Sequence, residues 1–389
     1  MSNEIMELNL GPQHPSTHGV LRLKLKLDGE VVVECDPVIG YLHTGVEKEC
    51  ETRVYLQMFT LISRLDYLSG PSEEHAFAQA VEQLMNIEVP ERAQVIRVIL
   101  LELARIASHL LWLGTSALEL NMSSVFMYAF VEREKILDLI ESYSGARMFP
   151  NSWRIGGLNR DLPDGFIAET RKFLKELPKA LNDLDNLLMD NYVWCERLQG
   201  VGVIDKALCE QYMCTGPVIR AAGVAYDIRK AYPYSGYENY SFDIPTQKEG
   251  DSYARYLVRV QEMRESISIV EQALNKLKPG PWIVDNRKVA LPPRSELARS
   301  MEAVIHQFKL VSEGIHPPVG TIYTAVESAR GELGYYVESD GSNKPYRVRV
   351  RSPSFPHVQV LKKIVPGLII SDVVVAIASM DPILGDVDR

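Results

Sequence analysis

The sequence predicts an α+β protein that is mainly α, with a helical bundle, a small N-terminal β-hairpin sheet and a second small sheet near the C-terminus. Three observations carry this prediction. Apolar and charged residues alternate over 20–35, a long apolar helical stretch follows Pro90, and alternation returns in "TIYTAVESARGELGYYVES" and "PYRVRVRSP". A period of two indicates half-buried strands, whereas apolar residues at helical spacing indicate packed helices.

The N-terminal hairpin is expected to turn at Asp28-Gly29, a dipeptide typical of tight turns between paired strands. Its inward face is predicted from the alternating apolar residues. These are Val20, Leu23, Leu25 and Leu27 on the first arm and Val31 and Val33 on the second.

Helical patterns occupy most of the remaining chain. The first covers 45–67 and is terminated by Gly70 and Pro71, and the second covers 72–85. A third begins after Pro90. The others cover 123–148, 163–191, 250–277, 295–310, 354–363 and 367–380. The helix after Pro90 is apolar almost all round, which predicts the centre of the bundle. We expect a single domain over 1–389, divided into a hairpin region (1–45), a helical core (46–191), an irregular excursion with few core positions (192–248), and helices with a small sheet (249–389).

Composition narrows the class of protein. The 389 residues are 46% hydrophobic and 24% charged, and a formal charge of -9 argues against nucleic acid as the main partner. The five cysteines include no CxxC pair, so they indicate no zinc site, no iron-sulfur cluster and no disulfide framework. The start "MSNEIMELNL" lacks the features of a signal peptide, and the apolar stretch 106–118 is shorter than the roughly 20 residues that span a bilayer. We therefore expect a cytoplasmic chain without a transmembrane segment.

Two histidines, His14 and His18, precede the hairpin in the loop "GPQHPSTHG". Three roles are open for them: metal binding, hydrogen bonds that fix the loop, and proton chemistry, for which the ordinary histidine pKa near 6.5 is suited. Pro15 disfavours the helical face that a metal site with this spacing requires.

Several charged residues stand in apolar surroundings. Glu102 and Arg105 are expected to pair at i, i+3, whereas no oppositely charged residue stands three or four positions from Glu119 in the sequence. In "SRLDYLSG", Arg64 and Asp66 are predicted to form an ion pair beside a packed tyrosine. The acidic tail "SMDPILGDVDR" is typical of a solvated chain end, although composition alone does not decide this.

Seven motifs, in order along nearly the whole chain, carry a family resemblance. They are "LNLGPQHPSTHGVLR", "PVIGYLHTGVEK", "SRLDYLSG", "RVILLELARIASHLLWLG", "GPVIRAAGV", "RYLVRVQEMRES" and "SMDPILGDVDR". The sequence resembles the D subunit of respiratory complex I, the bacterial counterpart of the mitochondrial 49 kDa subunit. That family is related to the large subunit of nickel-iron hydrogenases, so the resemblance implies a hydrogenase-large-subunit-like helical bundle.

The hydrogenase relationship identifies four positions where metal-binding cysteines would stand. Asp66, Ser69, Ile383 and Asp386 occupy them here, and these side chains cannot replace the soft thiolates that a nickel-iron centre requires. The resemblance implies instead that the former metal cavity receives a quinone headgroup, beside a small neighbouring subunit that carries the terminal iron-sulfur cluster.

The resemblance also implies residue roles. His18 and Tyr67 would hydrogen-bond the headgroup and supply protons, and Glu119, usually Asp in relatives, would pair with His18. Supporting or near-cluster positions are His14, Thr44, Arg64, Asp66, Phe149 and Arg154. Many relatives have arginine where Thr44 stands and histidine where Phe149 stands, so we expect the potential of the cluster to depend less on pH here.

The expected function is that of the quinone-site subunit of a proton-translocating NADH-quinone oxidoreductase, peripheral on the cytoplasmic side of the cell membrane. Its expected partners are quinone and complex I subunits B, C, I and H, with NAD and the iron-sulfur clusters bound by other subunits and no metal held by this chain. These residues are compatible with either ubiquinone or menaquinone as the quinone. They are also compatible with NADH, ferredoxin or another electron donor. Two rival functions are a structural scaffold for the cluster-bearing neighbour and the catalytic subunit of a membrane-bound hydrogenase.

Overall fold

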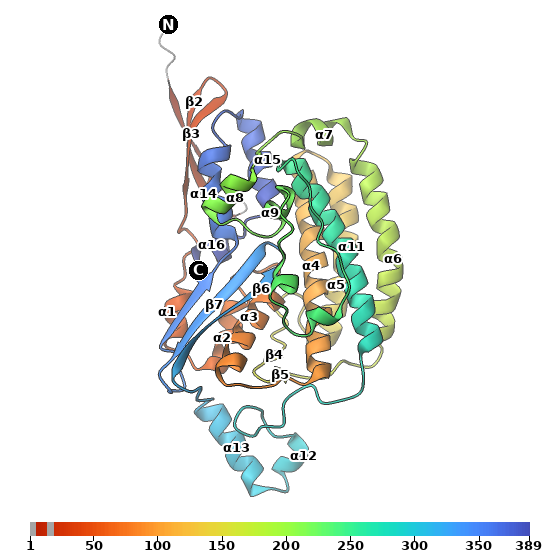
Figure 1. The fold of residues 1–389 in the computed structure, drawn as a ribbon, viewed down its shortest axis with the longest axis vertical. Helices are drawn as coiled ribbons and strands as arrows, with labels where there is room; N and C mark the ends of the chain where they lie inside the picture. Colours follow the sequence, from red (N-terminus) through yellow and green to blue (C-terminus); the bar gives the residue numbers. More distant parts are fainter. Residues whose placement is uncertain (1–4, 14–18) are drawn as a thin grey trace.

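The computed structural model describes residues 5–13 and 19–389 and has the predicted α+β, mainly helical architecture (Figure 1). A three-stranded antiparallel sheet lies near the N-terminus, a second lies near the C-terminus, and a bundle of long helices stands beside them. The predicted fold class is therefore confirmed. His14 and His18 lie outside the described residues.

The N-terminal sheet contains the predicted hairpin, β2 (Arg22–Asp28) and β3 (Val31–Val38), and a strand the sequence analysis missed, β1 (Met6–Leu10). Asp28 pairs with Val31, so the two turn residues are Gly29 and Glu30 rather than Asp28-Gly29. Gly29 has a φ of 63°, a conformation that glycine adopts without steric cost.

The predicted inward face of β3 was wrong. The pairing register shifts after Lys26, so that Val32 and Cys35 are buried opposite Leu27 and Leu25. Such a β-bulge reverses which side chains face the core. As a result Val31 and Val33 are 42% and 51% exposed.

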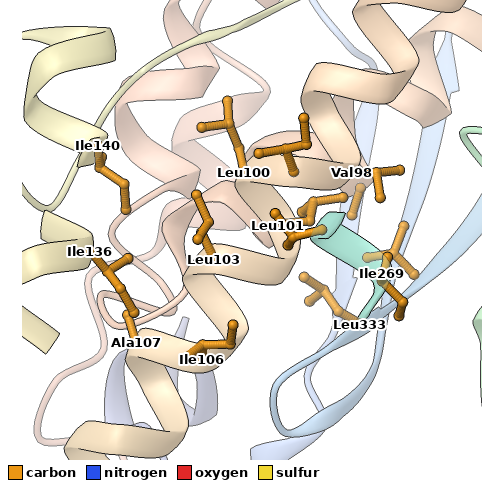
Figure 2. Close-up of a cluster of buried hydrophobic side chains, with 14 of the residues drawn as sticks. Val98, Leu100, Leu101, Leu103, Ile106, Ala107, Ile136, Ile140, Ile269 and Leu333 are labelled. Atoms are coloured by element: carbon orange, nitrogen blue, oxygen red, sulfur yellow. The ribbon is translucent and has the colours of Figure 1, made fainter. Parts of the chain in front are cut away.

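A bundle of four long helices forms the main core. The helices are α4 (Glu91–Glu119), α5 (Ser123–Ser144), α6 (Phe166–Leu188) and α11 (Ser252–Lys276). As predicted, α4 is central: it packs on α5 and α11, and its side chains are buried on all sides. Figure 2 shows Leu101 of α4 among apolar side chains from neighbouring elements, including Ile269 of α11 and Leu333 of the C-terminal sheet. None of the helices in the described part of the chain is long and apolar enough to cross a bilayer.

The segment predicted as one helix over 45–67 instead forms two short helices, α1 (Val46–Cys50) and α2 (Tyr55–Ile62), followed by a turn. The chain bends because α1 packs on the C-terminal sheet while α2 packs on α3 (Gly70–Leu84). Gly70 and Pro71 begin α3, where proline is well tolerated because the first backbone N–H groups of a helix have no partner within it. The turn 63–69 connects α2 to α3 and holds Asp66 and Tyr67.

The C-terminal sheet consists of β6 (Gly320–Ser328), β7 (Gly331–Ser339) and β8 (Arg347–Arg351) in sequential order, and α3 packs against β6 and β7. A two-stranded ribbon, β4 (Trp153–Arg154) and β5 (Gly157–Leu158), follows α5. The chain closes with α14 (Ser354–Ile364), α15 (Ile370–Met380) and α16 (Leu384–Asp388). Before the sheet, α12 (Arg294–Leu297) and α13 (Met301–Ser312) project at the lower end of the molecule in Figure 1.

The excursion over 192–248 contains short elements that link the sheets to the bundle. They are α7 (Tyr192–Leu198), α8 (Lys206–Tyr212), α9 (Pro217–Ala221), α10 (Ile228–Ala231) and the 3₁₀ turn Tyr237–Asn239. The expectation that it has few core positions was wrong. Trp194, Tyr234 and Tyr237 are buried and belong to the main core, because large aromatic rings bury much apolar area even in irregular backbone.

A network of buried charges crosses the bundle. The predicted pair of Glu102 and Arg105 is confirmed at 3.2 Å, and Arg229 of α10 adds a second ion pair to Glu102 at 3.1 Å. Tyr237 and Ser266 each donate a hydrogen bond of 2.6 Å to the same carboxylate. Burial disfavours the Glu102 carboxylate, but the two arginines lower its pKa below the ordinary value. The charge is therefore stable in the core only while both arginines face it.

We expect Glu102→Ala to destabilise the protein by about 3–5 kcal/mol, because it leaves Arg105 and Arg229 buried without their shared carboxylate. Guanidinium unfolding of the purified chain measures this loss. Glu176→Ala is the matched control: its carboxylate is 48% exposed and pairs with Lys135, so its loss should cost less than about 1 kcal/mol. Equal effects of the two substitutions would contradict a structural role for the buried network.

Candidate functional site

The turn 63–69 presents Asp66 and Tyr67 just before α3. Asp66 Oδ1 accepts hydrogen bonds from the backbone N–H groups of Leu68 and Ser69, both at 3.1 Å. Ser69 Oγ lies 2.8 Å from Ser72 Oγ, which joins the turn to the first turn of α3. An aspartate that hydrogen-bonds the backbone just after it is a common way to fix a tight turn. The backbone conformation on both sides of Tyr67 is therefore fixed by hydrogen bonds among Asp66, Leu68 and Ser69.

Arg330 is the central cation of this site. It lies in the tight turn between β6 and β7, where an arginine would normally be exposed, yet it is fully buried. Its Nη1 is 2.9 Å from Asp66 Oδ2 and its Nη2 is 3.2 Å from Asp381 Oδ2. One guanidinium thus joins the turn before α3 to the residue that ends α15.

The predicted ion pair between Arg64 and Asp66 was wrong. Asp66 faces inward to Arg330, whereas Arg64 is exposed and donates a hydrogen bond to the carbonyl of Thr60. The Arg64 guanidinium lies over the ring of Phe149, 4.9 Å from its centre. Residues two apart in this turn point to opposite sides, which separates the two charges.

The C-terminal segment packs directly against the same turn. A Cβ atom on Gly385 would stand 2.6 Å from the carbonyl oxygen of Leu65, so this contact requires glycine. Ile383 and Asp386, on either side of Gly385, are buried, as are Asp66 and Ser69 in the turn. The four positions predicted to replace hydrogenase ligands therefore lie on two segments in contact.

The chain end is not solvated, so the usual explanation of its charges was wrong here. Asp388 accepts hydrogen bonds from the backbone N–H groups of Gly40 at 2.8 Å and Leu42 at 2.6 Å. Arg389 donates to the carbonyl of Val350 at 2.7 Å. Buried charge is stable when it is fully paired or hydrogen-bonded, and these contacts meet that condition. They also fix the loop that carries Thr44.

Burial raises the pKa values of several acidic groups at this site. Burial raises the pKa of Tyr67, an effect that nearby Arg330 reduces and Asp66 reinforces. Burial likewise raises the pKa of Asp386 to about 6, and it raises the pKa of Glu73, which accepts a 2.6 Å hydrogen bond from Tyr335, well above the ordinary value. Tyr67 is thus a neutral phenol at physiological pH and can donate a hydrogen bond.

Hydrogen-bonding capacity remains at this site. Among the described residues, Arg330 Nε, Glu73 Oε1 and Asp386 Oδ1 are buried without a hydrogen-bond partner. Buried polar atoms are normally satisfied, so these three atoms are exceptions within the buried part of the site. No group of three or more His, Cys, Asp or Glu side chains within 5–13 and 19–389 is arranged to hold a metal ion.

Comparison with known proteins identifies the family of the chain. Residues 119–389 match the family described as the 49 kDa subunit of respiratory-chain NADH dehydrogenase. The chain belongs to this family. It is 74% identical to the D subunit of NADH-quinone oxidoreductase from Protochlamydia amoebophila, over 100% of this chain and 96% of the relative. It is 52% identical to the corresponding D subunit from Thermus thermophilus, over 100% of this chain and 95% of the relative.

The other residues that the sequence analysis predicted for the site lie on several separate elements. Thr44 is exposed in the loop after β3, and Phe149 is half-buried beneath Arg64. Arg154 of β4 is half-buried and donates to the carbonyl of Asn151 at 3.0 Å. Glu119, the last residue of α4, is half-buried and lines a small hollow with Trp112, Trp194 and Ser379. The pairing of Glu119 with His18 stays a prediction.

Sequence reasoning missed Arg330 and Glu73 and did not give Asp381 a role. Arg330 lies between two strands, where a charged turn residue is usually solvated, so its type and position gave no signal. Glu73 stands in the first turn of α3, where acidic residues are common, so its position gave no signal of a buried site. The one sequence signal that could have indicated a buried acidic site was the chain end, where three aspartates follow an apolar helix.

Replacing Asp386 should change how stability depends on pH. The Asp386 pKa is raised from 3.8 to about 6 by burial, so the stability linked to its protonation is present below about pH 4 and lost as pH rises through 6. Relative to Asp386→Asn, the wild type should lose up to about 3 kcal/mol of unfolding free energy between pH 4 and pH 7.

Guanidinium unfolding at half-unit pH steps measures this difference. The exposed Asp190, substituted by Asn, is the control and should give a curve parallel to the wild type. A constant offset between wild type and Asp386→Asn across the whole range would show that Asp386 does not titrate there.

Proposed function

We propose that this chain is the quinone-site subunit of a proton-translocating NADH-quinone oxidoreductase, in which it binds the quinone headgroup and supplies protons for reduction to quinol. The chain is a subunit of that oxidoreductase complex, as its family and relatives indicate. The finer assignment rests on one observation: Tyr67 stands on a turn that the buried ion pairs of Arg330 with Asp66 and Asp381 hold in place.

The chemistry of the substrate fits these groups. Reduction of a quinone to a quinol takes two electrons and two protons, and each carbonyl oxygen gains one proton. A phenol can donate a hydrogen bond to one carbonyl, and an imidazole can donate to the other. In this proposal Tyr67 is the first donor and His18 is the second, while Glu119 pairs with His18. The electrons come from an iron-sulfur cluster that another subunit holds.

The surroundings of Tyr67 support a site completed by a neighbour. Its side chain is only partly buried in this chain, while Asp66 and Arg330 behind it are fully buried. A headgroup placed against Tyr67 would therefore lie between this chain and the cluster-bearing subunit. When His18 gives up its proton, Glu119 would lose the partner that this proposal assigns to it. The rearrangement of Glu119 would then transmit the deprotonation of His18 to the membrane arm.

The proposed assembly follows from the same assignment. Complex I subunits B, C, I and H are the proposed neighbours, and the chain would lie peripherally on the cytoplasmic side of the cell membrane. NAD and the clusters belong to other subunits in this proposal.

The two rival functions make different predictions. A scaffold would tolerate substitution of Tyr67 as long as the complex assembles. A hydrogenase would need thiolates in the two contacting segments, where Asp66, Ser69, Ile383 and Asp386 stand instead. A nickel determination on the purified protein tests the second rival directly.

Tyr67→Phe should lower quinone reductase activity of the assembled enzyme by about 100-fold, because it removes the proton donor but keeps the ring. Reduction of the neighbouring cluster by NADH, followed by electron paramagnetic resonance, should be unchanged. Tyr192→Phe is the control, since Tyr192 is 75% exposed. Unchanged quinone turnover in Tyr67→Phe would refute the assignment.

The potential of the neighbouring cluster should depend only weakly on pH, because Phe149 cannot ionise. One proton per electron would give about 59 mV per pH unit, and we expect less than about half of that slope in redox titrations of the assembled enzyme. Phe149→His should steepen the slope, whereas Phe149→Leu should leave it shallow. A wild-type slope near the full one-proton value would contradict this expectation.

A further inference from the structure

Helix α13 carries an apolar face that its own chain does not cover. Ala303 and Leu310 are buried against the body of the protein. The opposite side exposes five apolar residues by 47–80%, namely Met301, Val304, Ile305, Phe308 and Val311. We call these five residues the α13 stripe. Successive helical residues are about 100° apart, so the stripe covers about 120° of the helix circumference.

Contacts at both ends hold α13 in place. Ser300 Oγ accepts a hydrogen bond from the N–H of Ala303 at 3.2 Å, which caps the start of the helix. At its end, Asn343 from the loop between β7 and β8 donates to the carbonyl of Glu313 at 2.6 Å. The projecting helix in Figure 1 is thus a preformed element, and little ordering entropy is lost when it binds a partner.

Positive charge accompanies the stripe. Residues 285–312 have a formal charge of +2, whereas the whole chain has -9. Arg294, Arg299 and Lys309 are exposed and form no ion pair with any described residue. Their charges are therefore available to a partner.

We propose that the α13 stripe docks into an apolar groove with an acidic rim on a neighbouring subunit of the complex. An amphipathic helix with exposed anchors at i, i+3, i+4 and i+7 is a common recognition element for such grooves. Large exposed apolar patches mark interaction sites, and the free cations match acidic side chains at the rim.

Two other occupants fit less well. A helix that lies on an anionic bilayer has a polar face rich in lysine and arginine. The side of α13 opposite the stripe is instead buried against the protein, and Glu302 balances Lys309 within the helix. In a symmetric dimer through the stripe, the cations of one copy would meet those of the other, which is unfavourable.

The test is site-specific photo-crosslinking in the assembled enzyme. Phe308 is replaced by p-benzoylphenylalanine, a substitution that keeps an exposed aromatic side chain, and the product is identified by mass spectrometry. We expect a crosslink to a peptide of one stoichiometric neighbouring subunit, with apolar residues at the crosslinked position and Asp or Glu beside it. A crosslink to lipid, to a second copy of this chain, or to no other molecule would overturn the proposal.

A charged substitution at Phe308 provides a second test of the same proposal. Phe308→Asp should increase the rate at which the crosslinked subunit is lost from the purified complex by about tenfold or more, as expected for an anchor residue. Met213→Asp is the control. Met213, just after α8, is 71% exposed, which matches the 69% exposure of Phe308. Equal retention of that subunit by wild type and Phe308→Asp would also overturn the proposal.

Discussion

Arg330 is the group on which the geometry of the site depends. Its guanidinium contacts Asp66 at 2.9 Å and Asp381 at 3.2 Å, and all three side chains are buried. Burial alone would disfavour the charged arginine, but the two aspartates raise its pKa instead. A buried cation between two carboxylates is costly to disrupt, because removing one partner leaves charge in a medium that solvates it poorly. The contact therefore fixes the turn that carries Tyr67 relative to the C-terminal segment.

Close backbone packing reinforces this arrangement. Gly385 lets the C-terminal segment approach the carbonyl of Leu65, and Gly216 lets the excursion pass the carbonyl of Arg330, where a Cβ atom would stand 2.3 Å away. Asp388 then binds the loop that carries Thr44. Segments from the start, middle and end of the chain meet around Tyr67. The long bundle supports them through α15, which packs on both α4 and α11.

The bundle itself is held by charge as well as by apolar contacts. Arg220 pairs with both Glu262 and Glu327 at 2.7 Å, and His109 lies 3.0 Å from Glu262. Burial opposes the Glu262 carboxylate, yet Arg220 and His109 lower its pKa below the ordinary value. These pairs connect α4, α9, α11 and β6. A shift of α9, α11 or β6 would leave a buried charge without its partner, so the network favours a single arrangement of these elements.

Local patterns were enough to predict the fold class, the hairpin, the central helix and the pair of Glu102 with Arg105. Local sequence patterns failed where two residues that form an ion pair or hydrogen bond are distant in sequence. Asp66 pairs with Arg330, 264 residues away, so no local spacing could indicate that contact. The reversed face of β3 came from a bulge that the alternation of Val31 and Val33 conceals. The chain end looked solvated because terminal charges usually are, and its burial depends on the loop at Gly40 and Leu42.

The most direct test of the central proposal is a cryo-electron microscopy structure of the assembled enzyme with quinone bound. We expect the headgroup to lie against the turn 63–69, with one carbonyl oxygen within hydrogen-bonding distance of Tyr67 Oη. A well-ordered headgroup that makes no contact with Tyr67 would contradict the assignment of this tyrosine as a proton donor.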